Sequence, residues 1–415
     1  MKIENKALKK LLKSCVILGI SILAILINRK AMESKALFKV AESEYLILAY
    51  NDLGMHCIQD DYSAFMILPP ANTVRVQVFE KGIDKAKLID SGIIVKYEMN
   101  NNTTSVDKSN FWKYAKDYGY DLKPNEGING NYLSGVCKLS KDKNYYEAEY
   151  VPVIPFNDGS KVRNPYQTMT VTVIDEATKK VLAQEDSIVV PVSDEMSCSN
   201  CHGKEDTYAN ILKAHDRKEK TSFYSDLNNN IRHKCNECHS DNALGALGTQ
   251  GVPSLSLAVH DFHAPIMGMS DLQNTCYNCH PGIETQCNRG AMYKAGITCS
   301  DSKCHGNMEN VAQSLKDGRR DWLDEPKCSN CHGELYSIKD NQLYREAYLQ
   351  NGPRGMIGRV KCATCHNSPH AEWISSLPQD NEIPIKIYGK PDFIKKCTAC
   401  HENRGNNKIH NYKGE

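Results

Sequence analysis

The chain has 415 residues, a formal net charge of +1 and 18 cysteines. This length allows two or three domains. The balanced charge argues against nucleic acid or an anionic membrane surface as the main partner.

Residues 1–36 have the pattern of an export segment. Lysines precede an almost entirely apolar run from Cys15 to Ile27, and Ser34 and Ala36 are small residues suited to a cleavage site. The run is shorter than the about 20 residues that span a membrane and suits a signal peptide. Because Arg29 and Lys30 follow the run directly, an uncleaved N-terminal membrane anchor is the alternative.

Residues 37–195 form the second predicted unit, and their pattern is β. Val74, Val76 and Val78 alternate with Arg75 and Gln77, the period of a half-buried strand. Turn-forming residues separate this segment from the other candidate strands. These are Tyr45–Tyr50, Ile93–Tyr97, Tyr145–Val153, Met169–Ile174 and Ser187–Val192. Short strands between turns predict an all-β sandwich-like domain of the immunoglobulin kind.

Residues 196–415 carry seven cysteine pairs, each followed directly by a histidine. Six have the form C-x-x-C-H: Cys198, Cys201 and His202; Cys235, Cys238 and His239; Cys276, Cys279 and His280; Cys328, Cys331 and His332; Cys362, Cys365 and His366; and Cys397, Cys400 and His401. The seventh is stretched to C-x-x-x-x-C-H, at Cys299, Cys304 and His305. C-x-x-C-H is the attachment signature of c-type haem, in which the thiols bind the porphyrin covalently and the histidine is the proximal iron ligand.

Zinc sites and disulfides are the alternative explanations of paired cysteines. Neither requires a histidine directly after the second cysteine of every pair. The sequence therefore predicts seven covalent haem c groups in a heptahaem domain. Between the motifs it predicts short helices over Thr207–Glu219, Met308–Leu315 and Leu343–Leu349, with irregular coil elsewhere. So few residues per haem would make the porphyrins themselves the core, which gives a mixed fold class.

The second axial ligands are expected among the other histidines. Of the 14 histidines in the chain, seven lie in the motifs. The candidate distal ligands are the other seven: His215, His233, His260, His263, His370, His410 and His56. Methionine is the competing ligand and would raise the reduction potential, so an all-histidine set predicts a low-potential carrier.

Four residues keep more than one interpretation. His56 lies in the β region, either as a turn residue or as a ligand that reaches a haem of its own or of a neighbouring chain. Cys57 and Cys137 could form a disulfide in an exported protein, which would leave Cys287 as a buried small residue or a reactive thiol.

Several segments resemble a family of exported multihaem c-type cytochromes from anaerobic, metal-reducing type bacteria. The resemblance rests on AYNDLGMHC (Ala49–Cys57), LPPANTVRVQV (Leu68–Val78), KSNFW (Lys108–Trp112), VVPVSDEMSCSNCH (Val189–His202) and the Cys276–Cys299 stretch. In that family the motif after this last stretch is usually C-x-x-C-H, whereas here it is the longer form. The resemblance implies electron transfer outside the cytoplasm and supplies neither substrate nor partner.

Two functions are compatible with these features. The leading expectation is an electron carrier of anaerobic respiration or extracellular electron transfer, without catalytic residues, periplasmic, on the cell surface or extracellular. Its partners would be redox proteins or an extracellular acceptor, or further copies in a homo-oligomer or filament. The alternative is a multihaem oxidoreductase with one open haem acting on a small nitrogen or sulfur compound. Every motif ends in histidine, without the lysine of nitrite-reducing relatives, which disfavours this alternative.

Overall fold

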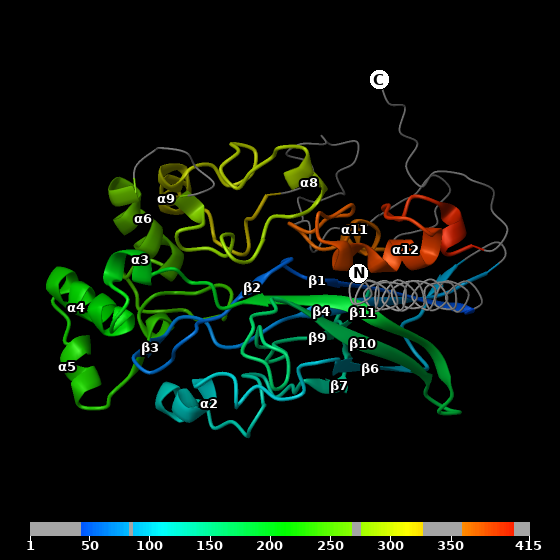
Figure 1. The fold of residues 1–415 in the computed structure, drawn as a ribbon, viewed down its shortest axis with the longest axis horizontal. Coiled ribbons are helices and arrows are strands. Elements are labelled where there is room, and N and C mark those ends of the chain that lie inside the picture. The colour runs from blue at the N-terminus through cyan, green and yellow to red at the C-terminus, as the bar shows by residue number, and fades with distance from the viewer. Residues whose placement is uncertain (1–42, 83–85, 268–274, 327–358, 402–415) are drawn as a thin grey trace, which may run out of the picture.

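A computed structural model describes residues 43–82, 86–267, 275–326 and 359–401. Strands fill one half of the molecule, and the short helices after residue 198 lie along one side and one end of them (Figure 1). The predicted export segment, the helix expected at Leu343–Leu349 and the motif of Cys328, Cys331 and His332 lie outside the described residues, as does His410.

The first sheet is built on the predicted valine alternation. Strand β4 (Val74–Glu80) pairs antiparallel with β1 (Tyr45–Asn51), and Val74, Val76 and Val78 are fully buried. Three shorter strands complete the sheet: β9 (Tyr146–Ala148), β8 (Lys138–Leu139) and β5 (Lys87–Leu88). The strand predicted over Tyr145–Val153 is thus shorter than expected, because the chain leaves the sheet after Ala148.

The second sheet has the order β2-β11-β10-β6-β7. Its strands are β2 (His56–Cys57), β6 (Ile93–Met99), β7 (Ser134–Val136), β10 (Tyr166–Asp175) and β11 (Val181–Ser193). Buried residues alternate along β10, as a sheet with one covered face requires. The predicted sandwich-like β region is confirmed. However, β2 pairs with β11 in parallel, unlike the antiparallel pairs of an immunoglobulin domain.

Short helices separated by coil follow the sheets, as predicted. The helix predicted over Thr207–Glu219 has these bounds as α4, and that predicted from Met308 is α9 (Met308–Lys316), which a capping box at Asn307 opens. The other α-helices are α2 (Phe111–Tyr114), α3 (Ser199–His202), α5 (Phe223–Asn228), α6 (Leu255–Met267), α8 (Ala291–Lys294), α11 (Cys362–His366) and α12 (Glu382–Tyr388). No helix within the described ranges has the length and hydropathy needed to cross a bilayer.

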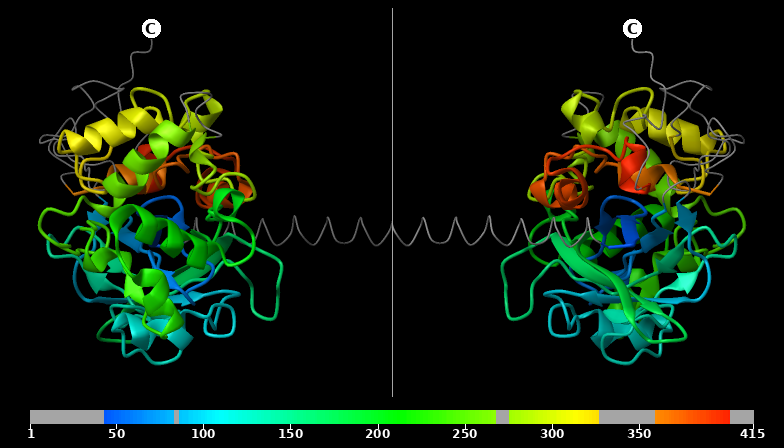
Figure 2. Two further views of the ribbon diagram at one scale, coloured as in Figure 1. Left: turned by 90° about the vertical axis from the view of Figure 1, so that its left-hand side faces the viewer. Right: turned by 90° about the vertical axis from the view of Figure 1, so that its right-hand side faces the viewer.

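The main hydrophobic core is shared between the sheets and the C-terminal helices. Trp373, Ile383, Ile394 and Ala399 belong to the same buried cluster as the valines of both sheets. Helix α11 packs on β1 and helix α12 on β11, and both end views show these helices lying against the strands (Figure 2). The two large sheets end at Ser193, near the predicted boundary, but their core continues into the haem-motif region.

Candidate haem sites

Among the described residues, four pairs of histidine rings lie side by side between His202 and His370. Each pair joins one motif histidine to one predicted distal ligand. We call them site A (His239 and His215), site B (His202 and His263), site C (His280 and His260) and site D (His305 and His370). The ring centres are 6.4, 6.3, 6.2 and 6.3 Å apart, respectively.

These separations fit a metal ion bound between the two rings. An imidazole nitrogen binds a metal at about 2.0–2.1 Å and lies about 1.1 Å from its own ring centre. Two rings that bind one ion from opposite sides therefore have centres about 6.3 Å apart. Rings in direct van der Waals contact could come closer than this. The four pairs thus have the spacing of bis-histidine iron sites.

The hydrogen bonds that Nδ1 donates show which ring nitrogen of each histidine is left to bind a metal. In sites A to D, backbone carbonyls accept from Nδ1 of His239, His263, His260 and His370, at 2.8, 2.7, 2.8 and 3.1 Å. A carbonyl oxygen can only accept, so Nδ1 carries the proton and the lone pair lies on Nε2. Nδ1 of His305 lies 3.3 Å from a Glu325 carboxylate oxygen. Such outer contacts fix the tautomer and the orientation of a metal-binding imidazole.

Two of the predicted distal histidines are positioned by one helix. His260 and His263 lie three residues apart on α6, so their side chains lie on the same side of the helix. Each Nδ1 bonds the carbonyl four residues earlier, that of Ser256 or Val259. The backbone thus aims both Nε2 atoms away from the helix axis, towards motif histidines of sites C and B.

The motif backbone folds alike in all four sites. The histidine N–H donates to the carbonyl of the first cysteine, at 3.0, 2.9, 2.9 and 3.2 Å in sites A to D. The stretched motif makes this bond too, from His305 to Cys299. Its two extra residues are taken up in a turn where Cys304 N–H donates to Asp301. The turn therefore brings the cysteines and histidine together as the shorter motifs do.

The two attachment cysteines differ in exposure at sites A and B. The second cysteines, Cys238 of site A and Cys201 of site B, are exposed, whereas the first cysteines, Cys235 and Cys198, are half-buried. At these two motifs the polypeptide itself therefore covers the first thiol of each pair more than the second.

The last two motifs lie on the main hydrophobic core and not at sites A to D. Their second cysteines, Cys365 and Cys400, are half-buried and pack against that core. Burial raises the pKa of the Cys365 thiol to about 12, and the charge of Cys400 contributes. These two motifs are therefore neighbours, with the second one beginning in a short helical turn at Cys397. Attachment at Cys328 and Cys331 stays a prediction, because both lie outside the described residues.

Burial keeps the two histidine rings of site C neutral. Burial lowers the pKa of His280 to about 4, and protonation of its neighbours His260, His305 and His370 would lower that pKa further. Burial also lowers the pKa of His260. Neutral imidazole is the form that binds a metal, so these rings are in the ligating form at pH 7.

His56 and His233 are placed differently from the other candidates. Nε2 of His56 lies 2.7 Å from Asp52 Oδ1, and Nε2 of His233 lies 3.0 Å from Asp226 Oδ2. Their nearest described ring partners are Trp322 and Phe223, respectively. Within the described part of the chain, neither ring pairs with a motif histidine. Among the remaining motif histidines, His366 stacks on Phe393 at 5.5 Å, and His401 forms a β-bridge with Gly82.

The disulfide that the sequence left open between Cys57 and Cys137 is not formed in the structure. Both are thiols, and they lie in different places. Cys57 ends β2 near Cys287, whose charge contributes to its raised pKa after burial. Cys137 lies between β7 and β8, where its N–H donates to Val95. The sequence could not reveal that Cys57 and Cys287 are neighbours, because strand pairing and a distant loop bring them together.

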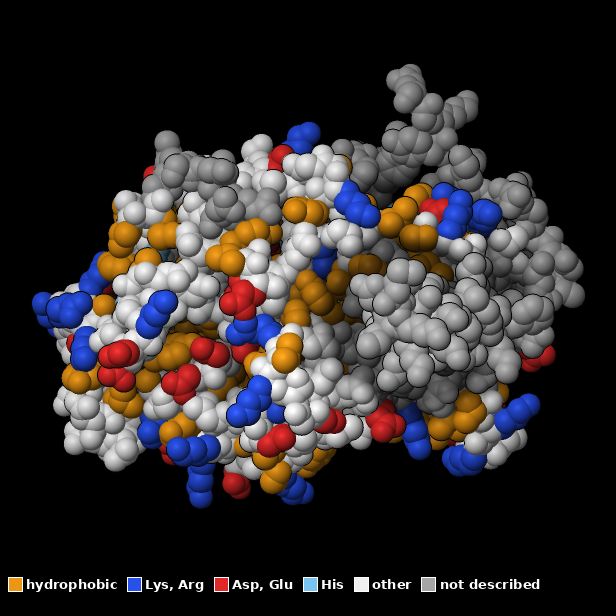
Figure 3. Space-filling model, viewed as in Figure 1, with side chains coloured by type: hydrophobic (Ala, Val, Ile, Leu, Met, Phe, Trp, Pro, Cys, Tyr) orange, Lys and Arg blue, Asp and Glu red, His pale blue; other side chains and the backbone are white. Residues whose placement is uncertain are grey.

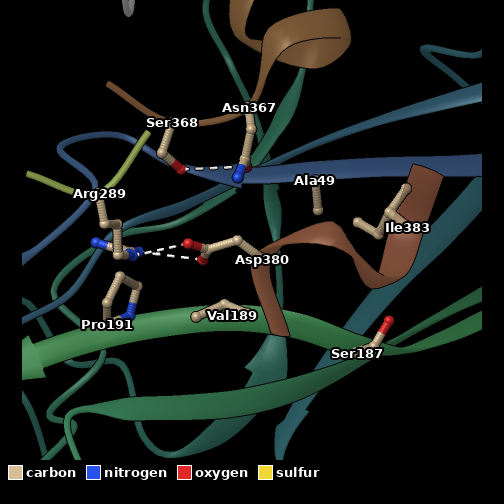
Figure 4. Close-up of a pocket in the computed structure, with 9 residues that line it drawn as sticks. All are labelled: Ala49, Ser187, Val189, Pro191, Arg289, Asn367, Ser368, Asp380 and Ile383. Atoms are coloured by element: carbon tan, nitrogen blue, oxygen red, sulfur yellow. Dashed lines mark hydrogen bonds and ion pairs between the residues drawn. The ribbon is translucent and has the colours of Figure 1, made fainter. Parts of the chain in front are cut away.

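A buried ion pair anchors site D to the rest of the molecule. Arg289 binds Asp380 through Nε and Nη2, at 2.7 and 3.1 Å, and each side chain is only 1% exposed (Figure 4). Arg289 Nη1 also donates to the Gly54 carbonyl. In addition, the backbone N–H groups of Arg289 and Gly290 both donate to the backbone carbonyl of His370. Composition did not single out Arg289. It nevertheless holds the loop that carries His370, a predicted distal ligand.

The comparisons with known proteins agree with these motifs. Residues 317–402 match the family "Cytochrome c7 and related cytochrome c". This range includes the motifs ending in His332, His366 and His401. No curated protein and no solved structure matches the chain. The C-terminal part is therefore a cytochrome c7-like multihaem region.

Proposed function

We propose that this chain is an electron carrier with seven covalently bound haems, four of them held at sites A to D by two histidines each. The single observation that carries the proposal is the ring separation of 6.2–6.4 Å, which recurs at all four sites. The haem supplies a reversible one-electron change at its iron. The c7-like region supports a multihaem cytochrome consistent with electron transfer.

The protein's contribution at each site is to hold two axial ligands in fixed orientations. Nδ1 hydrogen bonds fix the tautomers, and α4 and α6 fix the positions of His215, His260 and His263. An iron with two protein ligands has no position left for a substrate. The closed geometry of sites A to D therefore favours electron transfer over catalysis at these four sites.

Charges of both signs are mixed on one face of the molecule. Basic and acidic side chains are interspersed over the face in Figure 3, as the net charge of +1 predicts. The described side chains on this face therefore do not form the single-sign patch that would steer nucleic acid. Cytochromes c are typically exported, and the export pattern of residues 1–36 supports a location outside the cytoplasm.

Removing one distal ligand tests the proposal. We expect His263→Ala to leave the haem count unchanged by intact mass and to convert one low-spin ferric haem to high spin. Asp261→Asn on the same helix is the matched control and should leave every haem low-spin. An unchanged low-spin spectrum in His263→Ala would refute ligation by His263, and with it the bis-histidine assignment of site B.

A further inference from the structure

The geometry points to one continuous chain of sites in the order A, B, C, D, with a change in axial-ligand orientation between B and C. This inference rests on the proposed function, because it assumes that iron lies between the rings of each site. It adds an electron path and two electronic classes of site. Each of the three links in the path is carried by its own contacts.

Helix α4 links site A to site B. It follows directly after the motif of site B, and Asn210 Nδ2 donates to the His202 carbonyl at 3.0 Å. The same helix carries His215, the distal ligand of site A, further along. Because α4 begins at Thr207 and His215 lies eight residues further on, only the first two turns of this helix separate site B from the distal histidine of site A.

Helix α6 links site B to site C. His260 and His263 are separated by a rise of about 4.5 Å along the helix axis, yet they face motif histidines of different sites. The motif cysteines confirm this neighbourhood independently. Cys279 of site C interacts electrostatically with both cysteines of site B, Cys198 and Cys201.

Direct contacts between motifs link site C to site D. The side chains of Cys276 and Cys299, the first cysteines of the two motifs, lie within hydrogen-bonding distance of each other. His280 also lies within electrostatic range of both ring histidines of site D, His305 and His370. Site C therefore contacts site B, through α6 and Cys279, and site D, through Cys276 and His280.

The ring planes divide the four sites into two classes. The planes are nearly perpendicular at sites A and B, with interplanar angles of 86° and 78°. They are closer to parallel at sites C and D, at 21° and 28°. Perpendicular axial planes bring two ferric d orbitals close in energy and give a strongly anisotropic low-spin signal, whereas parallel planes separate these orbitals and give a rhombic one.

Selective reduction of one site tests the order. In His263→Met, methionine raises the potential of site B above that of bis-histidine sites, so site B is reduced first and becomes diamagnetic. Electron paramagnetic resonance is then recorded at a potential where only site B is reduced. Because a diamagnetic haem no longer broadens the signals of adjacent haems, the signals of the two sites next to site B should become sharper. We expect one strongly anisotropic signal (site A) and one rhombic signal (site C) to sharpen. In the matched variant His370→Met at site D, only the rhombic signal of site C should sharpen among the four.

The outcomes separate the order from the proposed function. Sharpening of both rhombic signals, or of neither, in His263→Met would overturn the order A, B, C, D. Sharpening of a strongly anisotropic signal in His370→Met would overturn it as well. Intact mass and total low-spin haem are measured in the same samples. Fewer than four low-spin haems in the unmodified protein would instead refute the proposed function.

Discussion

The buried pair of Arg289 and Asp380 allows a quantitative test of how the C-terminal region is attached to the sheets. Arg289→Met keeps much of the side-chain volume but removes the charge and four hydrogen bonds, to Asp380, Gly54 and Cys287. The Asp380 carboxylate would remain buried with Ser375 as a donor but without its cation. Breaking such a pair from one side lowers the free energy of unfolding by about 3–5 kcal/mol.

The assay is urea unfolding of the haem-loaded protein, followed by far-ultraviolet circular dichroism. Arg320→Met is the matched control, because Arg320 makes a similar two-point pair with Asp324 on the surface, where it is 63% exposed. Solvent-exposed pairs contribute little, so this variant should unfold like the parent. The double variant Arg289→Met/Asp380→Asn should recover part of the loss, because the uncompensated charge is gone.

Two results would refute this reasoning. One is a loss in Arg289→Met no larger than in Arg320→Met, which would mean that the buried pair does not hold the regions together. The other is a double variant less stable than Arg289→Met, which would mean that the unpaired carboxylate is not the cause of the loss.

Three further predictions concern separate parts of the chain. Replacing both cysteines of the stretched motif by alanine (Cys299→Ala/Cys304→Ala) should lower the intact mass by one haem beyond the side-chain change; an unchanged haem count would exclude attachment there. Glu195→Gln should destabilise the protein to urea, because the Glu195 carboxylate accepts the backbone N–H groups of residues 282–285, and equal midpoints would contradict this role. Burial raises the pKa of Asp158, but hydrogen bonds from Lys108 and Thr103 outweigh it and lower that pKa from 3.8 to about 2. The stability that this carboxylate contributes is therefore present above pH 3.8 and lost as the pH falls through about 2. The difference in free energy of unfolding between the parent and Asp158→Asn should shrink over that pH range. A difference that stays constant over this range would contradict the reasoning.

Local patterns in the sequence predicted the elements well. The valine alternation predicted β4, and helix α4 has the predicted bounds because both depend on neighbouring residues. The motifs themselves identify the attachment chemistry for the same reason. The predicted strand over Tyr145–Val153 failed in its second half, where tertiary packing takes the chain out of the sheet.

Pairings between distant segments could not be predicted from the sequence. A count of histidines showed that seven candidates exist, but not that His370 faces His305 or that His263 faces His202. It also left His56 as either a turn residue or a ligand, whereas the structure places His56 Nε2 2.7 Å from Asp52 Oδ1. These outcomes depend on which loops the shared core brings together, information that no local pattern carries.

The most direct test of the central claim is electron paramagnetic resonance of the oxidised protein, with haem quantified by intact mass in the same sample. The account predicts seven haems per chain and at least four low-spin ferric signals, two strongly anisotropic and two rhombic. A high-spin signal from more than three of the seven haems would contradict it, because at least one of sites A to D would then lack its second histidine.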